Sequence, residues 1–87
     1  MPTRADICRT LSESAFESVK TRLPAADVEF VHNLIFEHNE WGVGMETLVD
    51  TLLEDDIAIS ADQKKAIVEA MNALGKDRRQ MELRVVD

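Results

Sequence analysis

The sequence predicts an all-α fold, a small bundle of four main helices followed by a short C-terminal helix or packed tail. Apolar residues recur at intervals of three and four through most of the chain, which is the period of an α-helix. The composition agrees, because the 87 residues include only three glycines and two prolines. Two capping-box patterns also stand where helices would begin. A chain of this length suits one domain, so we expect residues 1–87 to form a single helical domain.

The first helix is expected over residues 4–22. Thr3 and Asp6 form the first capping-box pattern, in which each side chain accepts a hydrogen bond from the backbone N–H of the other residue. The apolar stripe that would face the core consists of Ile7, Cys8, Leu11, Ala15, Val19 and Leu23.

The second helix is expected over residues 24–39. Pro24 suits its first turn, where a missing N–H costs no intrahelical hydrogen bond. At about 100° per residue, the apolar face consists of Val28, Val31, Leu34, Ile35 and His38. His38 is therefore expected in the core. Phe36 falls on the opposite, polar face, which makes it a candidate contact residue.

The stretch WGVG, residues 41–44, is expected to form the corner between the second and third helices. Glycine gives the backbone extra freedom and weakens a helix interior, so Gly42 and Gly44 indicate a tight turn. Trp41 has two interpretations: it packs across this corner, which we favour, or it anchors an interface, as tryptophan often does. The third helix then covers residues 43–55. Its inward face consists of Met45, Leu48, Val49, Leu52 and Leu53.

Residues 57–59 are expected to form a short apolar connection to the fourth helix. Ser60 and Gln63 form the second capping-box pattern, and Gly75 is a natural stop for a helix that runs to residue 74. Beyond it, Met81, Leu83 and Val85 alternate as in a strand, but a lone strand would have no partner. We therefore expect residues 77–87 to form a short helix or a packed tail.

The net charge of the chain is −7, and it is distributed unevenly. Residues 23–63, the acidic window, contain no lysine or arginine, so all ten basic residues lie outside it. The ten acids inside the window are Asp27, Glu29, Glu37, Glu40, Glu46, Asp50, Glu54, Asp55, Asp56 and Asp62. A field of one sign repels nucleic acid and anionic membranes and attracts basic surfaces. We therefore expect a basic protein partner, with no direct binding of nucleic acid or membrane.

Three acids of the window, Glu46, Asp50 and Glu54, lie four residues apart and form an acidic ridge on the exposed side of the third helix. Like charges at this spacing repel by roughly 0.2–0.5 kcal/mol per pair. Asp55 and Asp56 add negative charge at the C-terminus of the helix, where the helix dipole disfavours it. No base in the window can relieve this repulsion, whereas a basic partner would. The alternative is a solvated helix face that tolerates small penalties.

No pattern in the sequence indicates catalysis, a cofactor or a metal site. His32 and His38 have no further ligands at a familiar metal spacing, and the acids after residue 54 lack the central glycine of a calcium loop. Cys8 is the only cysteine and lies in the apolar stripe, so neither a disulfide nor an exposed nucleophile is expected. The first residues do not have the layout of a signal peptide, and no apolar run is long enough to cross a membrane. We expect a soluble, cytoplasmic protein that is not an enzyme.

The segment HNEWGVGMETLVDTL, residues 38–52, is similar to a pattern in small immunity proteins of bacterial polymorphic toxin systems. It most resembles the MafI-type family and other immunity proteins of contact-dependent growth inhibition, and the resemblance extends over about residues 23–75. Asn39 stands where the pattern usually has glycine, and Gly44 stands where it usually has alanine. The positions that fit are Glu40, Gly42, Val43, Met45, Glu46, Leu48 and Asp50.

This resemblance implies a protein that binds and neutralises a cognate toxin domain. Many such toxins are nucleases with basic substrate surfaces, which agrees with the basic partner expected from the charge. The predicted partner-binding residues are Phe36, Glu37, Glu40, Trp41, Glu46, Asp50, Glu54, Asp55 and Asp56. Whether the protein plugs the active site of the toxin or clamps an outer site stays open. The alternative function is a small acidic helical adaptor or regulator that sequesters a basic protein.

Overall fold

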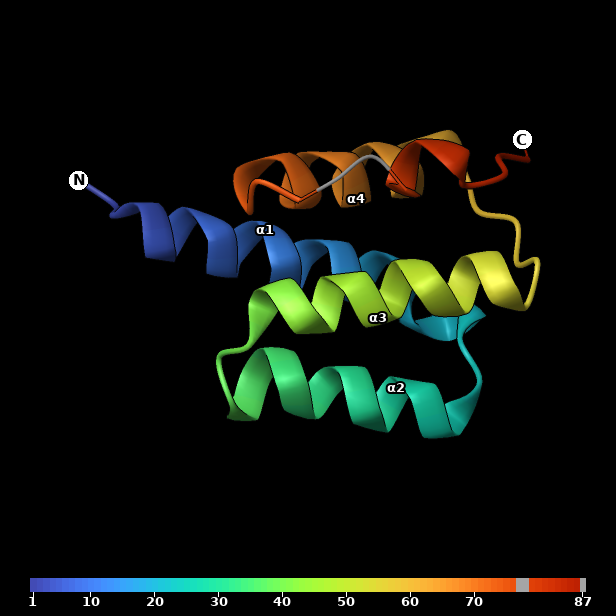
Figure 1. The fold of residues 1–87 in the computed structure, drawn as a ribbon, viewed down its shortest axis with the longest axis horizontal. Helices are drawn as coiled ribbons and strands as arrows, with labels where there is room; N and C mark the ends of the chain where they lie inside the picture. The colour runs from blue at the N-terminus through green and yellow to red at the C-terminus, as the bar shows by residue number, and fades with distance from the viewer. Residues whose placement is uncertain (77–78, 87) are drawn as a thin grey trace.

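The computed structural model describes residues 1–76 and 79–86, and the fold is all-α (Figure 1). The helices are α1 (Arg4–Val19), α2 (Ala25–His32), α3 (Trp41–Glu54) and α4 (Ala61–Ala73). Two turns prolong the first two helices, the 3-10 turn η1 (Lys20–Arg22) and the π-helical turn η2 (Asn33–Glu37). A further 3-10 turn, η3 (Arg79–Glu82), follows α4. The predicted bundle of four helices is confirmed.

The helices form two antiparallel pairs. Arg4 and Cys8, near the start of α1, both donate to the carbonyl of Ala73 at the end of α4, at 3.5 and 3.4 Å. At the other end of this pair, the amide of Gln63 donates to the carbonyl of Ser18 at 2.7 Å. α2 and α3 form the second pair, and α3 lies between α2 and α4 in Figure 1.

The two predicted capping boxes are both present. Thr3 Oγ1 accepts from the backbone N–H of Asp6 at 3.0 Å, and the Asp6 carboxylate accepts from the N–H of Thr3 at 3.1 Å. Ser60 and Gln63 make the same reciprocal bonds at 3.1 and 2.8 Å. Each box satisfies two backbone donors that a helix start would otherwise leave without a partner, which is why the sequence located both starts correctly.

Three residues with positive φ end the helices. Asn39, Asp56 and Gly75 have φ values of 54°, 52° and 69°. After α3 and α4 the chain closes in the same way, because the third residue beyond the helix donates back to a carbonyl of the last turn. The N–H of Ile57 bonds to Leu52 O at 2.9 Å, and that of Lys76 bonds to Met71 O at 3.0 Å. Asparagine and aspartate are the non-glycine residues that best tolerate this conformation.

The predicted glycine corner between the second and third helices is wrong in its details. α3 begins at Trp41, so both glycines lie inside its first turns, and Asn39 makes the corner instead. Gly44 is needed for close packing, since a Cβ atom there would lie 2.7 Å from Cγ1 of the fully buried Ile35. At Gly42 a Cβ would lie 2.9 Å from Cε of Lys76, whose side chain crosses α3 at this point.

The π-helical turn η2 explains two wrong predictions in the second helix. A π turn contains more residues than an α turn, so the side chains after it point in different directions from those of a regular helix. Phe36 is therefore half-buried and packs edge-to-face on Phe16, with ring centroids 5.8 Å apart, instead of lying on a polar face. His38 is exposed rather than buried in the core. His32, also exposed, stacks on the ring of Phe36 at 4.6 Å.

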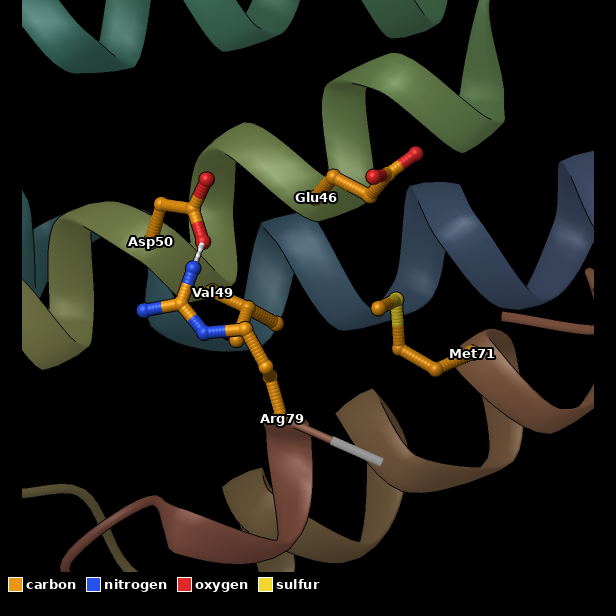
Figure 2. Close-up of a pocket in the computed structure, with 5 residues that line it drawn as sticks. All are labelled: Glu46, Val49, Asp50, Met71 and Arg79. Carbon is orange, nitrogen blue, oxygen red and sulfur yellow. Dashed lines mark hydrogen bonds and ion pairs between the residues drawn. The ribbon is translucent and has the colours of Figure 1, made fainter. Parts of the chain in front are cut away.

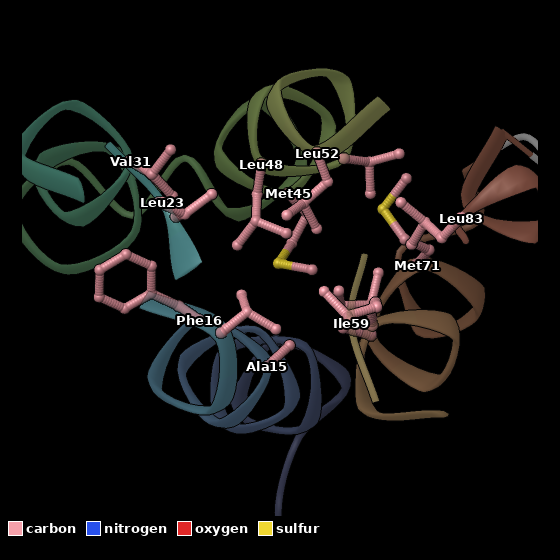
Figure 3. Close-up of a cluster of buried hydrophobic side chains, with 14 of the residues drawn as sticks. Ala15, Phe16, Leu23, Val31, Met45, Leu48, Leu52, Ile59, Met71 and Leu83 are labelled. Carbon is pink, nitrogen blue, oxygen red and sulfur yellow. The ribbon is translucent and has the colours of Figure 1, made fainter. Parts of the chain in front are cut away.

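All four helices contribute to one hydrophobic core (Figure 3). The predicted stripe of α1 is shifted slightly, because Ile7 is 45% exposed while Phe16 and Ser12 are buried. The core residues are Ala15, Phe16, Val19, Leu23, Val31, Ile35, Met45, Leu48, Val49, Leu52, Ile59, Ile67, Ala70, Met71 and Leu83.

The chain after α4 packs against the bundle, as predicted for a packed tail, but it also has the strand-like partner that we did not expect. Val85 forms a parallel bridge with Ile59, in which Ile59 N–H donates to Arg84 O at 3.0 Å and Val86 N–H donates to Ile59 O at 2.8 Å. Leu83 is buried beside them. Residues 77, 78 and 87 of the predicted tail lie outside the described residues.

Candidate protein-interaction surface

The acidic ridge runs along α3 on the side that faces the C-terminal segment. In Figure 2, the carboxylate of Asp50 meets the guanidinium of Arg79, while Glu46 lies farther along α3 and its carboxylate points away from Arg79. Glu54 is the last residue of α3, and Asp55 and Asp56 follow it directly. All five acids are at least partly exposed to solvent, so the ridge is a surface feature.

Three cations of the C-terminal part of the chain lie on these acids. Lys76 Nζ is 2.8 Å from Glu46 Oε1, and the guanidinium of Arg79 pairs with the carboxylate of Asp50. Arg84 donates to the side chain and to the backbone carbonyl of Asp56, at 3.2 and 2.9 Å. The window itself contains no base, as the sequence shows, but cations from beyond the window reach the ridge and relieve part of its repulsion.

These ion pairs are exposed and therefore weak. The side chains of Arg79 and Asp50 are 48% and 42% exposed, and those of Lys76 and Glu46 are 34% and 51% exposed. Exposed pairs of this kind contribute about 0–1 kcal/mol each to stability, because water and salt screen them. The cations thus lower the negative charge of the ridge, but their weak pairs do not fix the ridge carboxylates in place.

A small cavity lies where the ridge meets the C-terminal segment. Its volume is about 200 Å³, and its lining residues are Glu46, Val49, Asp50, Met71 and Arg79 (Figure 2). Val49 and Met71 are nearly fully buried and form its apolar part, while the ridge carboxylates and the guanidinium form its polar rim. The cavity can accommodate a slender side chain with an apolar stem and a cationic end.

A second group of predicted contact residues lies at the corner before α3. Glu37 and Glu40 are exposed, and no ion pair joins either of them to another residue that the structure describes. Phe36 and Trp41 are half-buried and pack against the hydrophobic core. The favoured interpretation of Trp41, packing at this corner, agrees with its position, and each aromatic ring leaves part of its surface exposed.

The nine predicted contact residues therefore fall into three sets. Three acids are paired within the chain, namely Glu46, Asp50 and Asp56. Four acids form no ion pair with any described residue, namely Glu37, Glu40, Glu54 and Asp55. Two are the aromatic residues of the corner. The paired acids Glu46 and Asp50 lie in the middle of this surface, and acids without a described ion-pair partner lie before α3 and at its C-terminal end.

Sequence reasoning did not identify the three cations as part of this surface. A signal for Arg84 was present, because it follows Leu83 in an alternating segment, and a buried leucine places its neighbour outward. No comparable signal pointed to Lys76 or Arg79. Two exposed apolar residues were also missed as contact candidates: Phe30 on α2 is 56% exposed and Val43 on α3 is 50% exposed.

The residues that the structure describes contain no cluster of three or more histidine, cysteine or acidic side chains able to hold a metal ion. Among the same residues, no helix combines the length and the apolar character that a membrane crossing requires. Comparisons with known protein families, with curated proteins and with solved structures found no match to this chain.

Proposed function

We propose that this protein is an immunity protein, which binds and neutralises a basic bacterial toxin domain through the acidic surface of α2 and α3. The observation that carries the proposal is the acidic window. Residues 23–63 contain ten acids and no lysine or arginine, and they include the whole hairpin of α2 and α3. A hairpin of one charge sign attracts a basic protein surface and speeds its encounter.

The four acids that pair with no described residue define how a partner would lie on this hairpin. Glu37 and Glu40 are at the N-terminal end of α3, and Glu54 and Asp55 are at its C-terminal end. α3 has 14 residues, so the two ends are about 20 Å apart at 1.5 Å per residue. A standard protein–protein interface covers about 800 Å² on each partner and spans this distance. One basic domain can therefore contact both acidic ends together.

The resemblance to immunity proteins of contact-dependent growth inhibition supports a toxin as the partner. Its residues run from Glu40, which is exposed and directly precedes α3, to Asp50 within that helix. Many toxins of such systems are nucleases, whose substrate-binding surfaces are basic. A nuclease domain would present the charge that the hairpin attracts, and the bacterial cytoplasm would be the place of action.

Co-expression tests this function directly. The protein would be produced together with the C-terminal domain of the protein encoded immediately upstream, and the cells would be scored for growth and the two chains for co-purification. Rescue of growth together with a stable complex is the expected result. A toxic domain that is neither bound nor neutralised would contradict the proposal and favour an adaptor that sequesters a different basic protein.

A further inference from the structure

Three cations occupy the carboxylates that the proposed function assigns to a basic partner. Lys76, Arg79 and Arg84, here called the charge mask, pair with Glu46, Asp50 and Asp56. We propose that the charge mask is an autoinhibitory contact: a basic partner binds the acidic ridge of α3, and Asp56 beyond its end, by displacing the mask cations from these carboxylates. This inference rests on the proposed function only in taking the partner to be basic.

The backbone that carries Arg79 and Arg84 is held independently of the ion pairs. Leu83 is 3% exposed, and the bridge between Ile59 and Val85 joins this part of the chain to the connection before α4. Lys64 Nζ adds two bonds, to the carbonyls of Met81 and Leu83, both at 3.0 Å. The mask side chains can therefore leave the ridge while the backbone from η3 onward stays docked.

The pairs themselves are suited to exchange. Arg79 and Arg84 have half-exposed side chains, and both lie on surface carboxylates that remain open to water on the other side. Exposed pairs on long side chains are weak and are formed and broken easily. An arginine or lysine from a partner would replace one cation with another, so the carboxylates would never be left without a counter-charge.

The cavity beside Asp50 gives such a replacement an additional contact. Its polar rim includes Arg79, and its lining includes Val49 and Met71. When Arg79 turns away, a partner side chain can place its aliphatic stem against these two residues and its charge between Glu46 and Asp50. Arginine and lysine bury their stems along apolar surfaces in this manner. The mask thus covers a site that suits a long basic side chain.

Selectivity would follow from this competition. A surface with one lysine gains little by replacing a pair that already exists. A surface with several basic residues in register replaces all three cations and adds its own contacts. The charge mask therefore weakens the binding of weakly basic proteins and leaves a strongly basic partner able to bind.

The test compares two double variants of equal charge. Lys76→Gln with Arg79→Gln removes two mask cations, and Arg9→Gln with Lys20→Gln removes two cations that form exposed pairs with Asp6 and Glu17 on α1. The probe is a short fluorescent oligolysine peptide, whose binding is followed by fluorescence anisotropy at about 0.1 M ionic strength, where charges more than about 10 Å apart are screened.

Unmasking predicts that the K76Q/R79Q variant binds the oligolysine about three- to tenfold more tightly than the wild-type protein, while the R9Q/K20Q variant changes by less than about twofold. The gain should disappear when Glu46→Gln and Asp50→Asn are added to the mask variant. Equal affinities of the two double variants would overturn the proposal, and so would a gain that survives removal of the two carboxylates.

A second measurement follows the wild-type protein by NMR during the same titration. The proposal predicts that the chemical shift of the Arg79 side-chain N–H changes, while the methyl chemical shifts of Leu83 stay the same because Leu83 remains buried. If the Leu83 methyl shifts changed together with the Arg79 signal, the tail would be leaving the bundle, and exchange of side chains alone would be contradicted. Because the oligolysine assay involves no toxin, the mask can hold while growth rescue fails, and rescue can succeed through the unpaired acids while the mask fails.

Discussion

The close contact between α2 and α3 predicts that alanine at position 44 destabilises the protein, although alanine is the better helix former. In the Gly44→Ala variant the new Cβ would lie 2.7 Å from Cγ1 of Ile35 and 3.4 Å from Cβ of Leu34. Ile35 is fully buried and branched at Cβ, so it cannot rotate away. Overpacking a core costs about 1–3 kcal/mol. Replacing glycine by alanine in a helix interior returns about 0.5–1 kcal/mol.

The expected net loss for this variant is about 0.5–2 kcal/mol, which corresponds to a fall in Tm of about 3–15 °C for a domain of this size. Thermal unfolding followed by circular dichroism measures it. Gly42→Ala is the matched control, because its Cβ would meet only the flexible end of Lys76. Its stability should be unchanged or higher by up to about 1 kcal/mol. If Gly44→Ala is as stable as Gly42→Ala, the packing explanation of Gly44 is refuted.

Two further predictions concern the tail and the first capping box. Leu83→Ala should lower the free energy of unfolding by about 2–4 kcal/mol, since Leu83 belongs to the core; a urea midpoint equal to that of the wild type would show that the tail contributes no packing. Hydrogen bonds from the backbone N–H and the side chain of Thr3, helped by Arg9, hold the pKa of Asp6 below its usual value of 3.8. A lowered folded-state pKa gives stability that is present above the unfolded value and is lost as the pH falls through the folded one. The Tm difference between wild type and Asp6→Asn should therefore be full at neutral pH and vanish in acid, and a difference that is the same at every pH would contradict this reasoning.

The sequence was sufficient for the parts of the fold that depend on local chemistry. Both capping boxes, the stop at Gly75 and the four helices follow from residues within a few positions of each other. The corner was misjudged because glycine has two uses, turning the chain and allowing close approach. Asn39 has the left-handed conformation, and Gly44 makes room for Ile35. Which of the two roles a glycine has here is decided by the packing of α2 on α3, which the local sequence does not show.

The π turn and the tail depended on tertiary contacts. A regular helical period through residues 33–37 puts Phe36 outward, and nothing local announces the extra residue that turns it toward Phe16. The alternation of Met81, Leu83 and Val85 was visible, but Ile59, the bridge partner of Val85, is far away in the sequence and lies in a segment that is not itself a strand.

The candidate surface was predictable in its charge but not in its pairing. The acidic window follows directly from the sequence, and all its acids except Asp62, which is in α4, lie in the hairpin of α2 and α3 or directly after it. The pairing of Asp50 with Arg79 joins positions 29 residues apart, and the pairing of Asp56 with Arg84 joins positions 28 residues apart. Such contacts follow from the path of the chain after α4, which no local pattern encodes.

The charge reversal that tests the acidic surface should avoid the paired acids. A lysine at position 50 would repel Arg79 and disturb the tail. Glu37 and Glu54 are better targets, because both are exposed and both end a helical segment, where a lysine suits the helix dipole. Glu13→Lys with Glu69→Lys on α1 and α4 is the matched control of equal charge change.

The most direct test of the central claim uses the proposed partner, the C-terminal domain of the protein encoded immediately upstream, and measures its affinity for these two double variants by isothermal titration calorimetry. Binding through the acidic surface of α2 and α3 predicts that Glu37→Lys with Glu54→Lys weakens the complex at least about tenfold, with a slower association. The control should stay within about threefold of the wild type. Equal affinities of both variants for the toxin domain would contradict the assignment of the acidic surface as the binding site.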